Sequence, residues 1–253
     1  MKKLWTLFKY DAYKLVVSPS TYAIAMIFAT FIGAIFISLL REYMVAEQDV
    51  PFVQMFFRYC WLSTCMAVAL ITMRSFSEEY KSCTFQSLFS VPVQLWQVVL
   101  AKFFAAYLFL LVLWLCTLPL FAAVGTSCGS ALLEAAFASK FSIIGGLLFT
   151  ALSGLFFIAI GIFASSLTEN QMISSMVTFC ILVPFFVYGH IWGNRSKFYS
   201  LDPWGTFSES LSVFSQMDDF CNGVLDSRAI VFYLSSCALA LCLSAIAVQR
   251  KLN

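Results

Sequence analysis

Charged residues that could bind a partner gather where the second long apolar stretch of the chain ends. Within eight positions after that stretch come Arg74, Glu78, Glu79 and Lys81. Such a junction is typical of a transmembrane helix that leaves the bilayer on the side where a soluble partner lies. Exposed charges of both signs recognise complementary groups on another protein, so docking is the chemistry that this cluster favours.

Common signatures of nucleotide and metal sites do not occur in the sequence. The chain has no GxxxxGK[ST] loop, no HExxH motif and no CxxC pair. Its one histidine, His190, stands near a predicted outer helix end, where we expect a structural role. We therefore predict that the chain is not an enzyme and has no catalytic, cofactor-binding or metal-binding residues. It has no basic patch for nucleic acid either.

The composition requires a bilayer as the solvent. Hydrophobic residues form 61% of the chain and charged residues only 11%, whereas a soluble domain carries about 25% charged residues. A helix needs about 20 apolar residues to span the hydrocarbon core. Six stretches reach that length: 21–40, 52–73, 98–124, 141–166, 172–192 and 229–248. They are too long for barrel strands, so we predict an all-α membrane protein, one domain over residues 1–253 with six transmembrane helices.

The distribution of Lys and Arg predicts the orientation. With the N-terminus inside, nine of these residues fall on inner segments and five on outer segments, whereas nine Asp and Glu fall outside. The positive-inside rule then places both termini in the cytoplasm. Arg58 lies inside the second span. It is either a buried functional charge or a side chain that snorkels outward along its aliphatic stem, and we favour snorkelling.

The residues before Pro19 form a predicted amphipathic helix. At helical spacing, one face is apolar and the opposite face is basic and aromatic. The apolar face holds Leu4, Trp5, Phe8, Ala12, Leu15 and Val16, and the other holds Lys2, Lys3, Lys9, Tyr10, Tyr13 and Lys14. We expect an interfacial helix anchored by Trp5, Phe8, Lys9 and Lys14. It is either a plain anchor or an elbow helix that packs beside the spans and moves with a cytoplasmic gate.

The largest cytoplasmic segment, residues 74–97, predicts a short coupling helix between the second and third spans. Ser75 or Ser77 can cap this helix. Glu78 and Glu79 then lie in its first turn, where carboxylates suit the positive end of the helix dipole. We expect these two side chains to be exposed and able to meet a partner.

Prolines and interfacial residues delimit the neighbouring elements. Pro92 ends the short helix, and Trp96 marks the re-entry of the chain into the membrane. Lys102, one to two turns further on, is expected to snorkel back to the same surface. Pro119 and Pro184 are expected to bend the third and fifth spans.

Small residues gather in the fourth span, at Gly145, Gly146, Gly154 and Gly161. They predict close approach between packed helices. The turn after this span, residues 165–171, is short, and Thr168 is predicted to cap the fifth span.

An outer amphipathic helix is predicted between the fifth and sixth spans. Asp202 is a good N-cap and Pro203 suits the first helical position. Five further residues then recur at helical spacing: Trp204, Phe207, Leu211, Phe214 and Cys221. The helix either lids a route through the spans or stabilises the interface. Cys128 and Cys221 fall in predicted loops, where a disulfide between them is an open alternative.

Three separated segments resemble type-2 ABC (ABC-2) transporter permeases. Residues 71–84 are similar to the segment by which these permeases contact their ATPase, and residues 165–171 to their second cytoplasmic turn. Residues 220–228, before the last span, form the third similar segment. Cys83 and Ala101 stand where the family usually has glycine. The chain resembles most the gliding-motility-associated branch, with the copper-site maturation permeases nearby.

The resemblance implies partners and a location. Two permease subunits, identical or related, would form the pore in the lipid of a bacterial inner membrane. Two separate ABC ATPase subunits would bind ATP and Mg, which this chain would not bind itself. The resemblance assigns contact with the ATPase to Arg74, Glu78, Glu79, Tyr80, Lys81, Thr84, Glu169, Asn170 and Gln171.

Two functions are compatible with these features. The first is ATP-driven export, for which a sparse set of hydroxyl residues in the spans favours an amphiphilic cargo over a soluble sugar. These residues are Ser63, Thr64, Thr72, Ser153, Ser174, Ser175 and Thr178. The alternative is a non-transporting mechanotransmission or scaffold module of an envelope or motility machine, which would use the same coupling segment without a continuous path.

Overall fold

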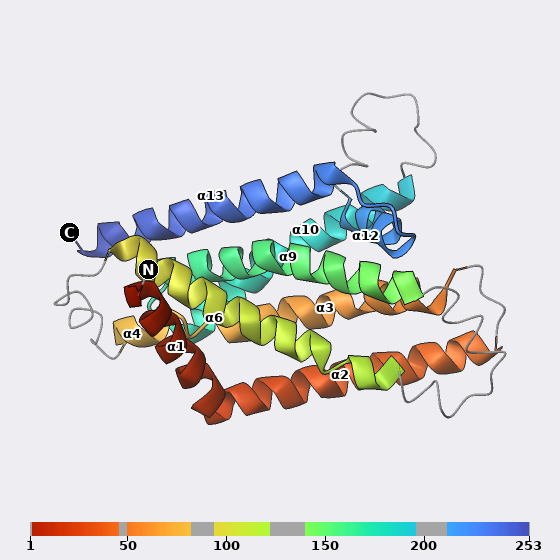
Figure 1. Ribbon diagram of the computed structural model, residues 1–253, viewed down its shortest axis with the longest axis horizontal. Helices are drawn as coiled ribbons and strands as arrows, with labels where there is room; N and C mark the ends of the chain where they lie inside the picture. The colour runs from red at the N-terminus through yellow and green to blue at the C-terminus, as the bar shows by residue number, and fades with distance from the viewer. Residues whose placement is uncertain (1, 46–49, 82–93, 122–139, 196–211, 253) are drawn as a thin grey trace.

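A computed structural model describes residues 2–45, 50–81, 94–121, 140–195 and 212–252. These residues form helices and no strands, in agreement with the predicted all-α class. The helices are α1 (Lys2–Val17), α2 (Pro19–Val45), α3 (Phe52–Thr72), α4 (Ser77–Lys81), α6 (Leu95–Leu115), α9 (Lys140–Leu167), α10 (Gln171–Arg195), α12 (Val213–Cys221) and α13 (Ser227–Leu252). The long helices lie side by side, with α1, α4 and both chain termini at one end and α12 at the other (Figure 1).

Five helices within the described ranges are long and apolar enough to cross a membrane, namely α2, α3, α6 with its continuation to Phe121, α9 and α13. They confirm five of the six predicted spans. The sixth corresponds to α10, a helix of 25 residues, whose described apolar part is the shorter stretch Gln171–Val187. A sixth crossing therefore stays a prediction, although it agrees with both termini lying at the same end of the bundle (Figure 1).

The two predicted proline bends differ in outcome. The regular helix α6 ends at Leu115, and a turn precedes a second helical segment over residues 118–121. Pro119 lies in this segment, where its missing N–H does no harm. Thr117 bridges the break by donating its hydroxyl hydrogen to the Trp114 carbonyl, 2.7 Å away. Pro184, in contrast, lies inside α10 without ending it, so a bend there stays a prediction.

Helix α9 is the central element, because α3, α6, α10, α12 and α13 all pack against it. Its glycines make this possible. A methyl group at Gly145 would overlap the backbone carbonyl of Phe220 in α12, and one at Gly146 would overlap the ring of Phe57 in α3. A methyl group at Gly161 would overlap the side chain of Thr72. The prediction that small residues in this span allow close helix approach is confirmed.

The end of the bundle opposite the termini is held by polar contacts between α3 and α12. Arg58 donates a hydrogen bond from Nη2 to Asp218 Oδ2 at 2.7 Å, and its guanidinium lies over the Phe214 ring at 5.6 Å. Gln54 Nε2 donates to Asn222 Oδ1 at 2.6 Å. Arg58, whose side chain is 42% exposed, thus pairs with a carboxylate of α12, and the favoured alternative of snorkelling to the outer surface stays a prediction. Figure 1 shows α12 lying across the ends of its neighbours.

The predicted outer helix is only partly within the described residues. Phe214 and Cys221 belong to α12, which begins at Val213. The five other predicted residues of this helix, Asp202, Pro203, Trp204, Phe207 and Leu211, lie outside the described ranges.

The sequence left open a disulfide between Cys128 and Cys221. In the structure, Cys221 is buried and its thiol is free. Cys221 is the last residue of α12, in agreement with its helical spacing, and is not a loop residue. Burial, and to a lesser extent the charge of Asp218, raises the pKa of the Cys221 thiol to about 12. A thiol that stays protonated reacts slowly. Cys128, the other residue of the suggested pair, lies outside the described residues.

Gly145→Ala should destabilise the protein, because the added methyl group meets the backbone of α12, which cannot rotate away. We expect a loss of about 1–3 kcal/mol, the usual range for overpacking. The matched control is Gly33→Ala in α2, since nothing lies within 4 Å of the position its methyl group would take. That variant should be neutral or stabilised by up to about 1 kcal/mol. Thermal unfolding in detergent measures both, and equal unfolding temperatures would contradict the close α9–α12 contact.

Candidate functional site

The short helix α4 is fastened to the end of α9. The backbone N–H groups of Phe76 and Ser77 donate to Ser165 Oγ at 3.0 and 3.3 Å. The Ser77 hydroxyl instead donates to the carbonyl of Met73. The prediction that Ser75 or Ser77 caps this helix is therefore wrong, because a serine from a distant helix accepts these hydrogen bonds. Ser165 is fully buried, so α4 is held at a fixed position on the bundle.

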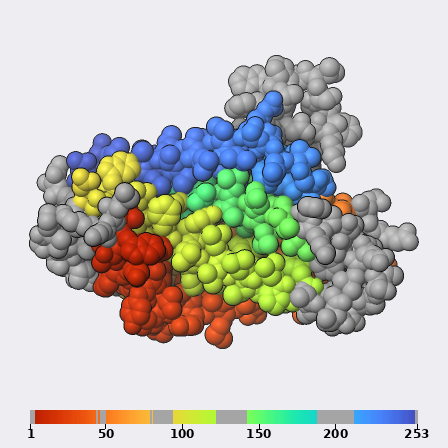
Figure 2. Space-filling model, in the orientation of Figure 1, coloured from red at the N-terminus to blue at the C-terminus, as the bar shows by residue number. Residues whose placement is uncertain are grey.

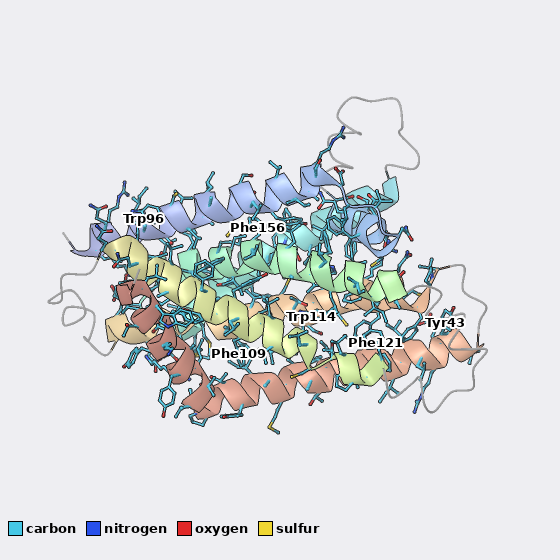
Figure 3. The ribbon with its side chains drawn as sticks, in the orientation of Figure 1. Tyr43, Trp96, Phe109, Trp114, Phe121 and Phe156 are labelled. Carbon is cyan, nitrogen blue, oxygen red and sulfur yellow. The ribbon has the colours of Figure 1, made fainter. Side chains whose placement is uncertain are left out.

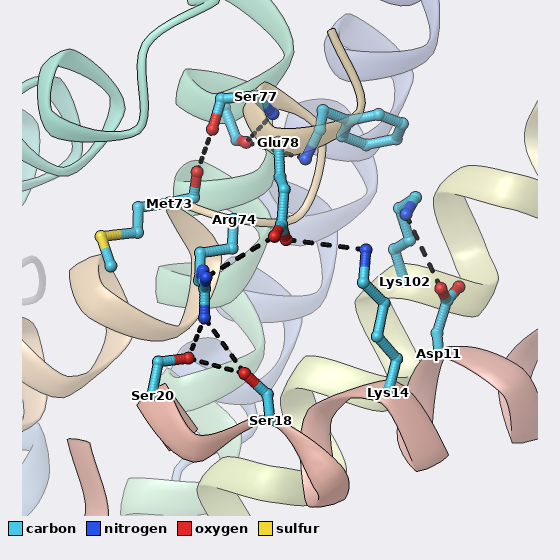
Figure 4. Close-up of polar contacts among 11 residues, drawn as sticks. Asp11, Lys14, Ser18, Ser20, Met73, Arg74, Ser77, Glu78 and Lys102 are labelled. Carbon is cyan, nitrogen blue, oxygen red and sulfur yellow. Dashed lines mark hydrogen bonds and ion pairs between the residues drawn. The ribbon is translucent and has the colours of Figure 1, made fainter. Parts of the chain in front are cut away.

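Arg74 and Glu78 form an ion-pair cluster with the N-terminal helices (Figure 4). Glu78 lies 3.5 Å from Arg74 Nη2 and 3.6 Å from Lys14 Nζ. Arg74 also donates to the hydroxyl groups of Ser18, at 3.1 Å, and Ser20. The side chain of Glu78 is only 33% exposed. The expectation of a freely exposed carboxylate is therefore wrong for Glu78, which joins α4 to α1 through Lys14.

A second ion pair is buried between α1 and α6. Lys102 Nζ lies 3.7 Å from Asp11 Oδ1, with side chains only 7% and 13% exposed. The ammonium group also lies 5.3 Å from the centre of the Phe76 ring. Lys102 thus turns into the bundle, and the expectation that it snorkels to the surface is wrong. The physical reason is the nearby carboxylate of Asp11, which compensates the charge.

Helix α1 packs along α6, as Figure 2 shows with α1 in red beside α6 in yellow-green. This contact favours the elbow alternative over a plain anchor, while movement with a gate stays a prediction. Among the predicted anchors, Trp5 is 58% exposed and stacks on Phe8 with ring centres 5.5 Å apart. Lys9 lies over the Trp5 ring at 5.7 Å. Lys14 is drawn to Glu78.

The turn between α9 and α10 meets α4 through the end of α13. Lys251 Nζ lies 4.1 Å from the centre of the Tyr80 ring and 3.9 Å from Glu169 Oε1. Glu169 itself is 79% exposed. The Thr168 hydroxyl donates back to the Ala164 carbonyl at 3.1 Å. Asn170, not Thr168, directly precedes α10, and its carbonyl accepts the Ser174 N–H, so the prediction that Thr168 caps the fifth span is wrong.

The structure thus brings the two predicted coupling segments to one end of the bundle. Six of the predicted residues lie there with described side chains: Arg74, Glu78, Tyr80, Glu169, Asn170 and Gln171. Glu79 and Lys81 belong to α4, but their side chains lie outside the described part of the structure, as does all of Thr84.

Three residues whose roles the sequence does not predict organise this end: Asp11, Ser165 and Lys251. Asp11 carried a usable signal, since it is the only acidic residue before Glu42 and lies in an otherwise basic helix. Ser165 and Lys251 carried none, because their partners lie far away along the chain.

The comparison with protein families agrees with this geometry. The model of the ABC-2 family transporter protein matches residues 11–185, well over half of the sequence. The chain belongs to the ABC-2 transporter family. The match includes α4, the turn at Glu169 and the buried pair at Asp11 and Lys102, whereas α12 and α13 lie beyond it. Among curated proteins, none matches the chain significantly.

Membership of the ABC-2 transporter family and the apolar helices make the chain a multi-pass membrane subunit of an ABC transporter. ATP hydrolysis in such a transporter belongs to an ABC ATPase partner. The permease end that carries α4, the turn at Glu169 and the tail of α13 is therefore the candidate docking site, which we call the α4 end.

Lys102→Met should destabilise the protein by about 3–5 kcal/mol, because it leaves the carboxylate of Asp11 buried without its cation. The double variant Asp11→Asn with Lys102→Met should recover much of that loss, since both charges are then removed. Thermal unfolding in detergent measures the cycle. Lys9→Met, an exposed substitution on α1, is the control and should change little. Additive losses in the double variant would show that the two groups do not interact.

Proposed function

We propose that this chain is the membrane-spanning permease subunit of an ATP-driven ABC exporter in the bacterial inner membrane. A separate ATPase, which binds ATP and Mg, would dock at the α4 end. The observation that carries the proposal is the contact of Lys251 with both Tyr80 and Glu169. This contact brings residues 71–84 and residues 165–171 together in one surface. Each of these segments resembles an ATPase-contacting segment of the family.

The connections of α4 suit it to transmit force. Its N-terminal amide groups are bound to α9 through Ser165, and Glu78 connects it to α1 through Lys14. Only a short turn separates it from α3. A displacement of α4 by an ATPase would therefore act on three membrane-associated helices together. Because coupling is reciprocal, the conformation of these helices would also change the affinity for the ATPase.

The transport route would lie between two permease subunits, identical or related. The hydroxyl groups of Thr64, Thr72, Ser153, Ser175 and Thr178 donate to carbonyls of their own helices. These five hydroxyl groups therefore do not offer their hydrogens to a polar cargo on a route through the membrane. Between α2 and α3, the described residues enclose a cavity of only about 10 Å³. A route bounded by apolar helix faces agrees with an amphiphilic cargo.

The same observations support the second candidate, a mechanotransmission or scaffold module. Such a module would keep the α4 end and the ATPase but would need no route. The resemblance to the gliding-motility-associated branch supports the same candidate. Uptake of an amphiphilic fluorescent cargo into inverted vesicles that contain the complex separates the two, since only the exporter accumulates cargo on addition of ATP.

Glu169→Arg should weaken ATPase binding at least about tenfold, because it reverses an exposed charge of the docking surface. Its fold should be unaffected, since exposed ion pairs contribute under about 1 kcal/mol. Glu169 suits this test better than Glu78, whose reversal would also break the contacts with Lys14 and Arg74. Co-purification with the cognate ATPase measures binding.

The matched control for that experiment is Glu42→Arg, an exposed reversal towards the far end of α2. It should leave co-purification and the mass of a complex with two permeases and two ATPases unchanged. Equal effects of the two substitutions would exclude the α4 end as the ATPase surface.

The orientation has its own test. A periplasm-specific reporter fused after Asn253 should be inactive, because the Lys and Arg distribution keeps the C-terminus inside. The same reporter inserted at Gly223, in the turn after α12 at the opposite end, should be active. The reverse pattern would place the α4 end outside the cell, where no ATPase could reach it.

A further inference from the structure

We propose that a cavity beside α4 binds the singly charged phosphate group of an inner-leaflet phospholipid. The cavity has a volume of about 80 Å³, which is room for several water-sized groups. It lies between α1, α2, α3, α4 and α6 in the region drawn in Figure 4. Its charged lining residues are Asp11, Lys14, Arg74, Glu78 and Lys102.

The charges of the described residues that line the cavity do not cancel. Among these residues, three cations and two carboxylates line it, which leaves one net positive charge. The ion pairs among them span 3.5 to 3.7 Å, whereas a direct charge-assisted hydrogen bond spans about 2.7–2.9 Å. The charged groups therefore surround the space without closing on one another. A phosphodiester carries one negative charge and would neutralise the remainder.

The guanidinium of Arg74 supplies the second observation. Its Nη1 donates to the hydroxyl group of Ser18, but its Nε is buried and has no hydrogen-bond acceptor among the described residues. A buried donor on a charged group is expensive to leave unpaired. A phosphate oxygen in the cavity would accept this hydrogen bond, and guanidinium groups match phosphate geometry well. Thr21 and Ser75 also line the space.

The position of the cavity favours a lipid as the source of the phosphate. Trp96 lies at the same end of the bundle (Figure 3), and Lys102 follows it on α6 by about 9 Å of helical rise. Trp5, Tyr10 and Tyr13 of the adjoining α1 are exposed. Exposed aromatic residues mark the level of the lipid headgroups. A nucleoside triphosphate would bring several negative charges to a site with one positive charge to neutralise.

Native mass spectrometry of the full chain in detergent tests the proposal. The protein is titrated with phosphatidylglycerol, with diacylglycerol, which has no phosphate, and with glycerol 3-phosphate and inorganic phosphate. We expect one phosphatidylglycerol to bind per chain, with little binding of the other three. Lys14→Gln and Arg74→Gln should each lower this affinity at least about tenfold.

The matched controls are Lys9→Gln, on the same helix as Lys14 but outside the cavity lining, and Arg228→Gln at the far end of the bundle. Neither should change the affinity. Unfolding temperatures without lipid check each variant, and Lys14, which is 47% exposed, carries the test if Arg74→Gln does not fold. Equal lipid binding in all variants would overturn the site, and equal binding of the soluble phosphates would overturn the lipid source. The experiment contains no ATPase, so its outcome is independent of ATPase docking.

Discussion

The buried contact between Lys102 and Asp11 determines how one end of the bundle is organised. A lysine that turns inward from α6 near the membrane edge needs a carboxylate, and Asp11 of α1 supplies one. This need holds α1 along α6 instead of leaving it free on the membrane surface. Once α1 is in place, Lys14 can reach Glu78, and Ser18 can reach Arg74. The contacts that α4 makes with α1 and the start of α2 thus depend on the ion pair between Lys102 and Asp11.

Close packing of α9 provides the rigid counterpart to this charged end. Gly145, Gly146 and Gly161 let three separate contacts reach the backbone of α9. In a bilayer, where burying apolar side chains against each other gains little over lipid, such close van der Waals contact is a main source of stability. Because Ser165 stands at the end of the same helix and accepts hydrogen bonds from α4, the central helix connects directly to the candidate docking surface.

The two ends of the molecule use ion pairs differently. At the far end, Arg58 and Asp218 make a direct hydrogen bond of 2.7 Å that joins α3 to α12. At the α4 end, the ion pairs are longer and surround a cavity. A direct pair suits a fixed joint. Longer pairs around a space suit a surface whose helices can shift while their charges stay compensated, as an elbow beside a coupling helix would need.

The sequence alone determined that the protein lies in a bilayer, that it is helical and roughly where five spans lie. A bilayer requires long apolar segments, and these can be recognised from the order of residues alone. The sequence also located the charged cluster after the second span, since charges at the end of a span stand out against an apolar background. Asp11 as an isolated acidic residue was visible too, but its partner was not. The roles of Ser165, Lys251 and Lys102 were decided only by tertiary structure. Each depends on a partner more than 80 positions away, and the same side chains could equally have faced water, lipid or headgroups until the helices packed.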